Sequence, residues 1–345
     1  MEYRQLGRSG LRISKLGLGT MIGFNRSTQK EATRIIHRAI DMGINFIDTA
    51  DAYAESEETV GNALAEGNKR EKVVLTTKFG WYTGKGPNDY GAGRKHIIAQ
   101  CEESLRRLKT DYIDQYMIHV VDATTPMEEM LYTLDMLVKQ GKVRCIGTSK
   151  YPSCKIVEGI FISRRYGWAG FVNEQSPYSL LDRAADIELI AVCRNYGVGF
   201  TPVFPIAKGL LSGKYRSGIK AIPSGRVGND IPGEVLETVE KLAKLAENRN
   251  ITLAEFSLAW LMQQPGVTAP ILGARTMEYL ESGLRACDVK LTDKELGEVD
   301  KIVPPGSFVR DDVGYEANVY GPLRQGYVSS AKLNRKKTDY FIPVS

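Results

Sequence analysis

Cysteine and histidine are scarce in this chain. Its 345 residues contain five cysteines and three histidines, and no C-x-x-C pair occurs. The cysteines are few, their number is odd and they are widely spaced, which argues against a disulfide framework and a zinc site. This pattern favours a reducing cytoplasm. Three histidines are too few for a His-rich metal centre. We therefore expect a cytoplasmic protein without a bound metal.

Long apolar runs and clustered charge are also missing. No stretch of about 18 uncharged apolar residues occurs, as a membrane span would require. The N-terminal MEYRQLGRSGLRISKLGLGT has no apolar core of the signal-peptide type. The net charge of +5 is spread along the chain, whereas nucleic-acid-binding proteins concentrate basic residues on one face. We expect a small molecule, rather than a membrane or a nucleic acid, as the partner; the oligomeric state stays open.

What the chain does contain is a regular alternation of short apolar runs and longer runs of helical period. The apolar runs predict eight strands, at 14–21, 44–50, 72–78, 112–119, 143–150, 171–175, 198–203 and 268–274. Helical patterns follow at 28–42, 54–68, 93–108, 126–140, 152–164, 184–196, 233–248 with 252–264, 276–286 and 292–302. Eight strand–helix alternations favour an α/β fold with a closed parallel sheet, the (β/α)8 TIM barrel.

A doubly wound open sheet is the competing architecture. It usually shows a G-x-G-x-x-G turn between its first strand and helix, and LGLGTM at 16–21 is not followed directly by a helical pattern. We predict one barrel domain over 1–345, with an N-terminal hairpin around Gly7–Gly10 that caps the barrel floor. The long gap at 204–232 is typical of a functional or mobile loop. The C-terminal extension, 303–345, lacks periodicity and could shape a substrate pocket.

Polar residues follow three successive predicted strands, at the rim where barrel enzymes place their catalytic groups. Asp48 and Tyr53 follow the second strand, Lys78 ends the third and His119 ends the fourth. A lysine ammonium beside a tyrosine lowers the phenol pKa, which is about 10 in the free side chain. An aspartate can hold that lysine, and a histidine can bind a substrate oxygen. Such a set can protonate a carbonyl oxygen while a hydride reaches the carbon.

Each of these residues also has an ordinary structural interpretation. Asp48 could cap the helix predicted at 54–68, and Lys78 or His119 alone would be unremarkable surface residues. Asp51 fits a turn or a helix cap. The coincidence of four suitable side chains at consecutive strand ends is what favours catalysis.

Several motifs resemble the aldo-keto reductase superfamily. They are NFIDTADAY (45–53), VVLTTKFG (73–80), DYIDQYMIH (111–119), GKVRCIGTSKY (141–151), PIAKGLLSGKY (205–215) and, more loosely, PILGARTMEYLE (270–281). The likeness runs from about Arg4 to about Asp300. It implies a carbonyl reductase that uses NADPH, with NADH possible. By position, Tyr53 would be the general acid, Lys78 bound to Asp48 would tune it, and His119 would orient the carbonyl.

The resemblance also implies cofactor contacts. Ser149 and Gln175 match positions that hold the nicotinamide carboxamide, and Gly19 and Thr20 match a turn near the cofactor. The loop that lies over the pyrophosphate would contain Leu210, Ser212 and Lys214. The segment that grips the adenosine 2′-phosphate would contain Gly273, Arg275 and Thr276, with Arg275 as the charge partner.

Some positions depart from the family pattern. Lys150 replaces an asparagine that contacts the nicotinamide. Val203 stands where an aromatic residue commonly stacks on that ring, and the adjacent Phe204 would point elsewhere in an extended chain. The adenine-binding helix carries Tyr279, Ser282 and Gly283 and lacks the usual Glu and Asn. These changes bear on cofactor affinity and on the choice between NADPH and NADH.

The resemblance leaves two other functions open. One is a biosynthetic ketoreductase that acts on a nucleotide-linked keto-sugar. The basic and aromatic C-terminal extension could contact such a substrate. The other is a cofactor-binding regulatory subunit without essential catalysis, since some relatives of this family are channel-associated.

Overall fold

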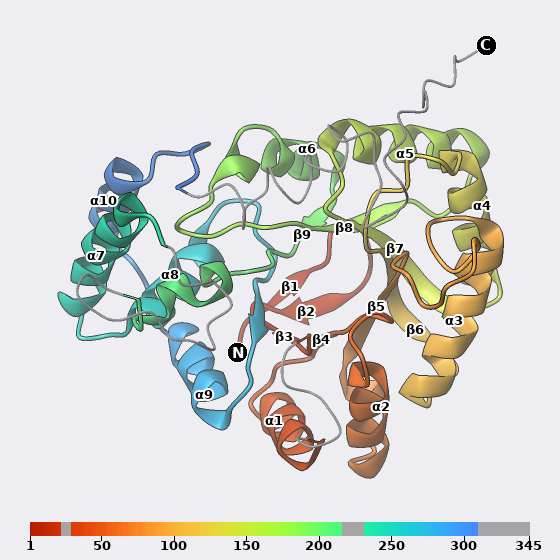
Figure 1. Cartoon of the computed structure of the whole chain (residues 1–345), viewed down its shortest axis with the longest axis horizontal. Coiled ribbons are helices and arrows are strands. Elements are labelled where there is room, and N and C mark those ends of the chain that lie inside the picture. Colours follow the sequence, from red (N-terminus) through yellow and green to blue (C-terminus); the bar gives the residue numbers. More distant parts are fainter. Residues whose placement is uncertain (22–28, 216–230, 310–345) are drawn as a thin grey trace.

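Eight parallel strands form the centre of the fold, and helices surround them (Figure 1). The computed structural model describes residues 1–21, 29–215 and 231–309. Its strands are β3 (Gly17–Gly19), β4 (Phe46–Asp48), β5 (Val74–Phe79), β6 (Ile113–Ile118), β7 (Val143–Ser149), β8 (Phe171–Gln175), β9 (Gly199–Phe200) and β10 (Ile271–Gly273). They pair in the order β10-β3-β4-β5-β6-β7-β8-β9, and every pairing is parallel.

Hydrogen bonds between β9 and the segment before β10 close the sheet. Phe200 forms a parallel bridge with Val267. The Thr268 N–H donates to the Phe200 carbonyl at 2.7 Å, and the Ile271 N–H donates to the Pro202 carbonyl at 2.9 Å. The predicted (β/α)8 barrel is therefore confirmed. The strand predicted at 198–203 contains only two residues, because Pro202 has no N–H to donate to a neighbouring strand.

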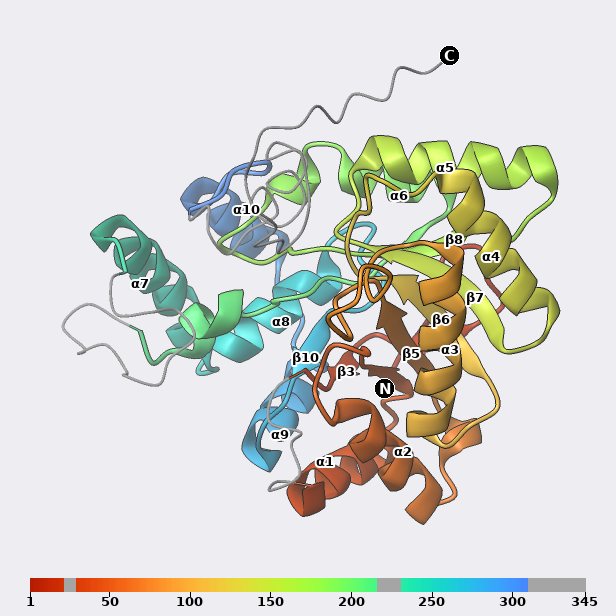
Figure 2. The same ribbon diagram turned by 45° about the vertical axis from the view of Figure 1, so that its right-hand side comes forward.

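Ten helices are described, and they lie on the outside of the strands, as Figure 2 shows for α3, α4 and α5 beside β6, β7 and β8. Their bounds are α1 (Gln29–Asp41), α2 (Ser56–Glu66), α3 (Arg94–Leu108), α4 (Met127–Lys139), α5 (Ser153–Tyr166), α6 (Leu189–Tyr196), α7 (Gly233–Glu247), α8 (Leu253–Gln263), α9 (Met277–Ala286) and α10 (Asp293–Ile302). Helix α2 begins two residues later than predicted, because Ala54 has a left-handed φ of 47°. Helix α6 begins at Leu189 because 184–186 form a separate 3-10 turn.

The predicted N-terminal hairpin is present and covers the floor of the barrel. Strands β1 (Tyr3–Gln5) and β2 (Arg12–Ser14) are antiparallel. The Arg4 guanidinium donates to the carbonyls of Met262 at 2.9 Å and Val267 at 3.1 Å. Inside the barrel floor, one apolar cluster joins hairpin and strand residues: Leu6, Ile13, Phe46, Val74, Ala269 and Ile271. The hairpin thus seals the end of the barrel opposite the carboxyl ends of its strands.

Two segments singled out by the sequence lie partly outside the described residues. Within the gap predicted at 204–232, residues 216–230 are not described, and the C-terminal extension is described only to Val309. Its first residues pair with the loop after β8. The Arg183 N–H donates to the Ser307 carbonyl at 2.8 Å, and the Val309 N–H donates to the Leu181 carbonyl at 2.9 Å. The start of the extension therefore reaches the same end of the barrel as the strand termini.

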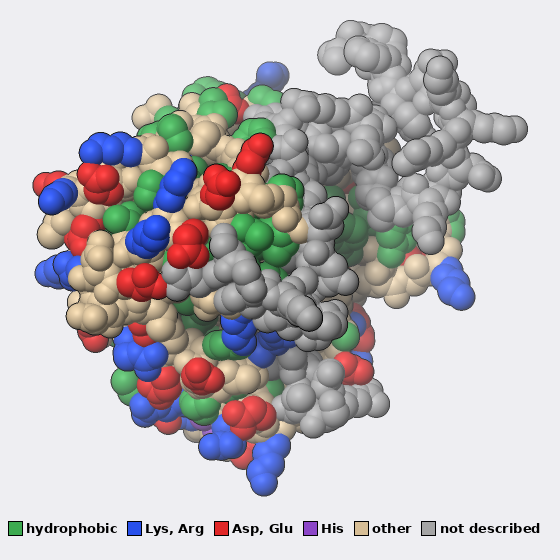
Figure 3. Space-filling view, turned by 60° about the vertical axis from the view of Figure 1, so that its left-hand side comes forward, with side chains coloured by type: hydrophobic (Ala, Val, Ile, Leu, Met, Phe, Trp, Pro, Cys, Tyr) green, Lys and Arg blue, Asp and Glu red, His purple; other side chains and the backbone are tan. Residues whose placement is uncertain are grey.

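The surface of the described residues carries mixed charge. On the side that bears α7 and α10, acidic and basic side chains are interspersed, with apolar groups scattered between them (Figure 3). None of the helices in the described ranges is long and apolar enough to cross a lipid bilayer.

Replacing Gly7 with alanine should destabilise the fold. Gly7 has a φ of 53°, and a Cβ atom there would lie 2.1 Å from the Val172 carbonyl oxygen. The left-handed backbone and this contact with a rigid strand should together lower the free energy of unfolding by about 2 kcal/mol or more. Gly10→Ala is the control in the same hairpin, because its Cβ would meet nothing within 4 Å. Denaturant unfolding that gives equal values for both variants would contradict the role of Gly7.

Candidate active site

A buried ion pair joins the ends of β4 and β5. The Lys78 ammonium lies 2.7 Å from Asp48 Oδ1, and the two side chains are 0% and 4% exposed. The same ammonium donates to the Thr49 carbonyl at 2.8 Å. Asp48 Oδ1 also accepts from the Gln175 side-chain amide at 2.9 Å. Burial lowers the pKa of Lys78, while the charge and hydrogen bond of Asp48 oppose that shift.

Tyr53 and His119 meet directly beside this ion pair. The Tyr53 hydroxyl lies 3.3 Å from His119 Nε2, and the two rings are edge to face with centroids 5.4 Å apart. The Lys78 ammonium lies 5.3 Å from the centroid of the Tyr53 ring. The structure therefore brings together all four residues that the sequence singled out as catalytic.

Burial keeps His119 uncharged. Its removal from water, followed by the nearby positive charges of Lys150 and Lys78, lowers the pKa of the imidazole well below the usual value. A neutral ring can donate from one nitrogen and accept at the other. His119 is thus suited to bind an oxygen next to the Tyr53 hydroxyl without adding a third positive charge.

The loop between β4 and α2 holds Tyr53 through backbone hydrogen bonds. The Tyr53 N–H donates to the Ala50 carbonyl at 3.1 Å, and the Ser56 N–H donates to the Tyr53 carbonyl at 3.0 Å. The Asp51 N–H donates to the Lys78 carbonyl at 3.1 Å, which ties the loop to β5. Burial, reinforced by the nearby Glu57, raises the pKa of the Asp51 carboxyl to about 8. Asp51 is therefore a buried turn residue within the tyrosine loop.

The residues expected near the nicotinamide, and those of the turn expected near the cofactor, lie around the ion pair of Lys78 and Asp48. The Thr20 hydroxyl donates to the Asp48 carbonyl at 3.0 Å, and the Ser149 hydroxyl donates to the Gln175 carbonyl at 3.0 Å. Gly19 lies where β3 meets β10, and a Cβ there would come within 2.7 Å of the Ile271 side chain. One network of hydrogen bonds therefore links Thr20, Asp48, Gln175 and Ser149 around the mouth.

The residues proposed to bind phosphate come from two segments, the N-terminus of α9 and the 207–214 loop after β9, which meet through Lys214 and Tyr279. Arg275 and Lys214 are exposed, and the Lys214 ammonium donates to the Tyr279 hydroxyl at 2.7 Å. Thr276 caps the helix by accepting from the Tyr279 N–H at 3.4 Å. Free N–H groups and the helix dipole favour an anion at such a terminus. Gly273 is exposed and Ser212 is half-buried, whereas the Leu210 side chain is fully buried and leaves only its backbone for a ligand.

Two of the departures from the family pattern have structural causes. A Cβ at Gly283 would lie 2.3 Å from the Leu272 side chain, so this glycine lets α9 pack on β10. The Ser282 hydroxyl donates to Glu255 on α8 at 3.4 Å. Both residues therefore serve helix packing. Tyr279, by contrast, binds Lys214 at the edge of the phosphate-binding segment.

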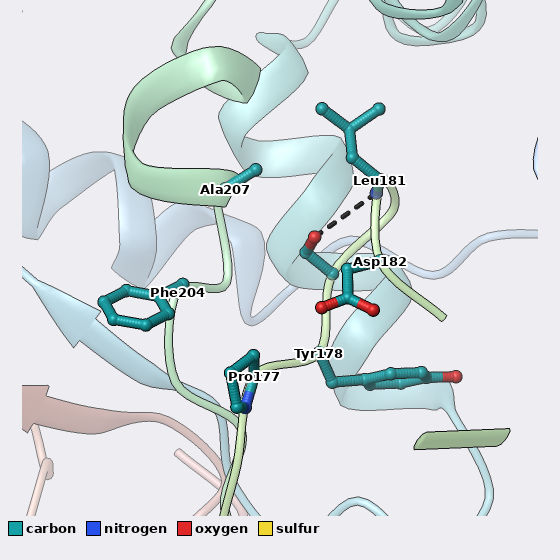
Figure 4. Close-up of a pocket in the computed structure, with 7 residues that line it drawn as sticks. Pro177, Tyr178, Leu181, Asp182, Phe204 and Ala207 are labelled. Atoms are coloured by element: carbon teal, nitrogen blue, oxygen red, sulfur yellow. Dashed lines mark hydrogen bonds between the residues drawn. The ribbon is translucent and has the colours of Figure 1, made fainter. Parts of the chain in front are cut away.

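The expected direction of the Phe204 side chain assumed an extended backbone. The backbone at Phe204 is not extended, so that prediction does not apply. Phe204 has a φ of 56°. Phe204 and Pro177 both belong to the wall of a small hollow formed by the loops after β8 and β9 (Figure 4). The hollow is lined by Pro177, Tyr178, Ser179, Leu181, Asp182, Phe204 and Ala207, and none of the four catalytic candidates is among them. Val203 remains part of the barrel wall, where its N–H donates to the Ser176 carbonyl at 3.0 Å.

Sequence reasoning missed two residues of this mouth. The Trp81 ring lies edge to face with His119, with centroids 6.1 Å apart. Its position three residues after Lys78 was the available signal. Glu174 is buried in β8 and accepts from the hydroxyls of Thr148 and Ser176. A charged residue inside the apolar run FVNEQ could have indicated it.

Comparison with known proteins supports one family. The family model described as "Aldo/keto reductase family" matches residues 15–304. An "Uncharacterized oxidoreductase YrpG" of Bacillus subtilis (strain 168) is 36% identical over 319 residues, which cover 89% of this chain and 97% of that protein. A "Probable voltage-gated potassium channel subunit beta" of Arabidopsis thaliana is 34% identical over 320 residues, with 88% and 97% covered. A protein of the same name in Oryza sativa subsp. japonica gives the same identity and coverage.

Three observations point to the same family: the barrel, the four side chains at its mouth and the extent of these matches. The chain belongs to the aldo/keto reductase family, and it is an NAD(P)H-dependent oxidoreductase.

Proposed function

We propose that the protein is a cytoplasmic carbonyl reductase that uses NADPH to convert an aldehyde or ketone to an alcohol. The observation that carries this proposal is the contact of Tyr53 with His119 directly beside the buried pair of Lys78 and Asp48. A buried ion pair contributes little to stability, because desolvation offsets its attraction. Its position at the carboxyl ends of barrel strands, where such enzymes work, favours a catalytic purpose.

The four residues have distinct roles in this reaction. NADPH, when bound, supplies the hydride that reaches the carbonyl carbon. The Tyr53 hydroxyl donates its proton to the carbonyl oxygen, and the nearby Lys78 ammonium stabilises the phenolate that remains. Asp48 keeps that ammonium charged and in place. The neutral His119 ring donates to the same carbonyl oxygen from Nε2 and so fixes the carbonyl relative to Tyr53.

The residues present fit a phosphorylated dinucleotide. The Gln175 side-chain amide donates to Asp48, and the Ser149 hydroxyl donates to the Gln175 carbonyl, so both lie at the strand ends where they can hold a carboxamide. At the other end, Arg275 and Lys214 are exposed beside the N-terminus of α9, which suits a 2′-phosphate. This pair of cations supports NADPH as the preferred cofactor over NADH.

A regulatory role is the second candidate, and the comparisons are what favour it. Two relatives that match over nearly their whole length carry the name of a potassium channel subunit. A cofactor-binding barrel without essential catalysis would have no need of the proton donor. The keto-sugar alternative rested on the C-terminal extension, of which 310–345 lie outside the described residues, and it stays a prediction.

Removing the Tyr53 hydroxyl should abolish most of the reduction. Tyr53→Phe should lower kcat for an aldehyde by about 100-fold or more, the scale of general acid catalysis, and leave NADPH affinity unchanged. Tyr132→Phe, at an exposed position on α4, is the matched control. NADPH oxidation by the Tyr53 variant at the wild-type rate would exclude the assigned proton donor, and an inactive wild type that binds NADPH would favour the regulatory role.

The ion pair allows function to be separated from stability. Lys78→Met leaves Asp48 buried without its partner and should lower the free energy of unfolding by about 3–5 kcal/mol. The double variant Asp48→Asn/Lys78→Met removes both charges and should recover most of that loss. Its kcat should nevertheless stay about 100-fold or more below wild type. Recovery of activity together with stability would mean that the pair is only structural.

Arg275 should bind the 2′-phosphate of NADPH, which NADH lacks. Arg275→Ala should weaken NADPH binding by about 10-fold or more, because a charge-assisted hydrogen bond is lost, and leave NADH binding nearly unchanged. Fluorescence titration with both cofactors measures the difference. Arg285→Ala is the control, since Arg285 lies at the opposite end of the same helix and is 61% exposed. Equal weakening of NADPH and NADH would argue against this role.

A further inference from the structure

Lys150 is a second lysine in the mouth of the barrel, and the proposed reaction does not use it. It directly follows Ser149 at the end of β7. Its ammonium lies 5.9 Å from the centroid of the Trp81 ring, which follows β5. Because β6 lies between β5 and β7, a side chain that begins after β7 and reaches Trp81 spans the end of β6. His119 is the residue at that end, so the Lys150 side chain lies across the mouth next to it.

The backbone conformation that directs the Lys150 side chain is energetically unfavourable. Lys150 has a φ of 59°, a left-handed conformation that is unfavourable for a lysine by about 1–2 kcal/mol. Its N–H donates to the Gln175 carbonyl at 3.0 Å. The following N–H, of Tyr151, donates to the buried Glu174 carboxylate at 3.3 Å. A strained residue held by buried partners in this way is typical of functional sites.

The Lys150 ammonium has no counter-ion among the residues that the structure describes. Among the described residues it forms no ion pair, whereas the neighbouring Lys78 is neutralised by Asp48 at 2.7 Å. Glu174 is close enough to raise the pKa of Lys150, but its oxygens are occupied by Thr148, Ser176 and the Tyr151 N–H. A partly buried cation without a counter-ion is unfavourable. A ligand that brings a negative charge would relieve this cost.

We propose that Lys150 selects the substrate by binding an anionic group, a carboxylate or a phosphate, attached to the carbonyl compound that is reduced. The inference rests on the proposed carbonyl reductase function and names its substrate class. The Lys150 ammonium and the His119 ring both lie beside the Trp81 ring, 5.9 Å and 6.1 Å from its centroid. A substrate whose carbonyl oxygen lies at Tyr53 and His119 can therefore extend along Trp81 and place its negative group at Lys150. The neighbouring side chains of Lys78, Asp48 and His119 are buried, and a charge-assisted contact is stronger in such surroundings than in water.

The test compares two substrates that differ in charge and by a single methyl group. These are 4-formylbenzoate and its uncharged methyl ester, each reduced by the complete enzyme with NADPH. The ratio of their kcat/KM values should favour the anion by about 10-fold or more in the wild type. Lys150→Met should remove that preference, and Lys150→Arg should restore most of it. Lys155→Met is the matched control, since it removes a positive charge that is 42% exposed on α5.

The preference should also depend on pH. Burial and the charge of Lys78 lower the pKa of Lys150 to about 8. The ammonium is present below that pH and is lost as the pH rises through it, so the preference for the anion should fall across the same range. Using the ratio of the two substrates removes effects on Tyr53 that both share. The charged and titratable groups that face Lys150 from the surrounding elements are Lys78, Asp48, His119, Glu174 and Lys208.

The outcomes separate this inference from the proposed function. If the wild type reduces the ester and the anion equally, Lys150 does not select an anion, although the reductase function stands. If Lys150→Met weakens NADPH binding and leaves the substrate ratio unchanged, Lys150 serves the cofactor and the inference is overturned. If neither aldehyde is reduced, the reductase function fails. Calorimetric titration of the NADP⁺-bound protein with 4-(hydroxymethyl)benzoate and its methyl ester then decides the role of Lys150, and equal affinities would refute it.

Discussion

The contact between Lys78 and Asp48 is the interaction on which the mouth of this barrel depends. It joins two neighbouring strands at their carboxyl ends and is fully withdrawn from water. The same Asp48 oxygen accepts from Gln175 on the far side of the barrel, so one carboxylate holds β4, β5 and β8 together. With its charge satisfied in this way, Lys78 can lie beside the Tyr53 ring as a stable ammonium. Everything proposed for the chemistry requires a positive charge at that place.

The arrangement also explains why the histidine is neutral. Two lysines act on His119, and both add to the effect of burial in lowering its pKa. Only one of them, Lys78, is compensated by a carboxylate at short range. A charged imidazole would therefore be the third cation in a confined and partly dry space. Keeping His119 neutral leaves it as a hydrogen-bonding group, whereas Lys150 forms no ion pair within the described residues, which is the basis for proposing that it binds an anionic substrate.

Much of this could be predicted from sequence, because it depends on local patterns. Asp48, Lys78 and His119 end apolar runs, and the parallel order of those runs brings their ends to one rim. The sequence could not predict features that depend on residues with a left-handed backbone or on contacts between residues far apart in the chain. Phe204 was expected in an extended chain but has a φ of 56°. Gly283 looked like the loss of a cofactor contact, and its actual constraint is the Leu272 side chain on β10. The contact of Lys150 with Trp81 joins residues from strands that are not adjacent.

These local departures leave the catalytic set intact and change what surrounds it. The Lys150 position shows the difference most clearly. An asparagine at the end of β7 would present a short, neutral amide to whatever lies beside Ser149. A lysine at the same place, with its backbone in the left-handed region, extends past the end of β6 to the Trp81 ring. The substitution therefore moves a polar group from the proposed nicotinamide side of the mouth toward the Trp81 ring, along which the proposed substrate lies. In the proposed reaction the reacting groups are those of the family, and the proposed role of Lys150 is to select the carbonyl compound by its charge.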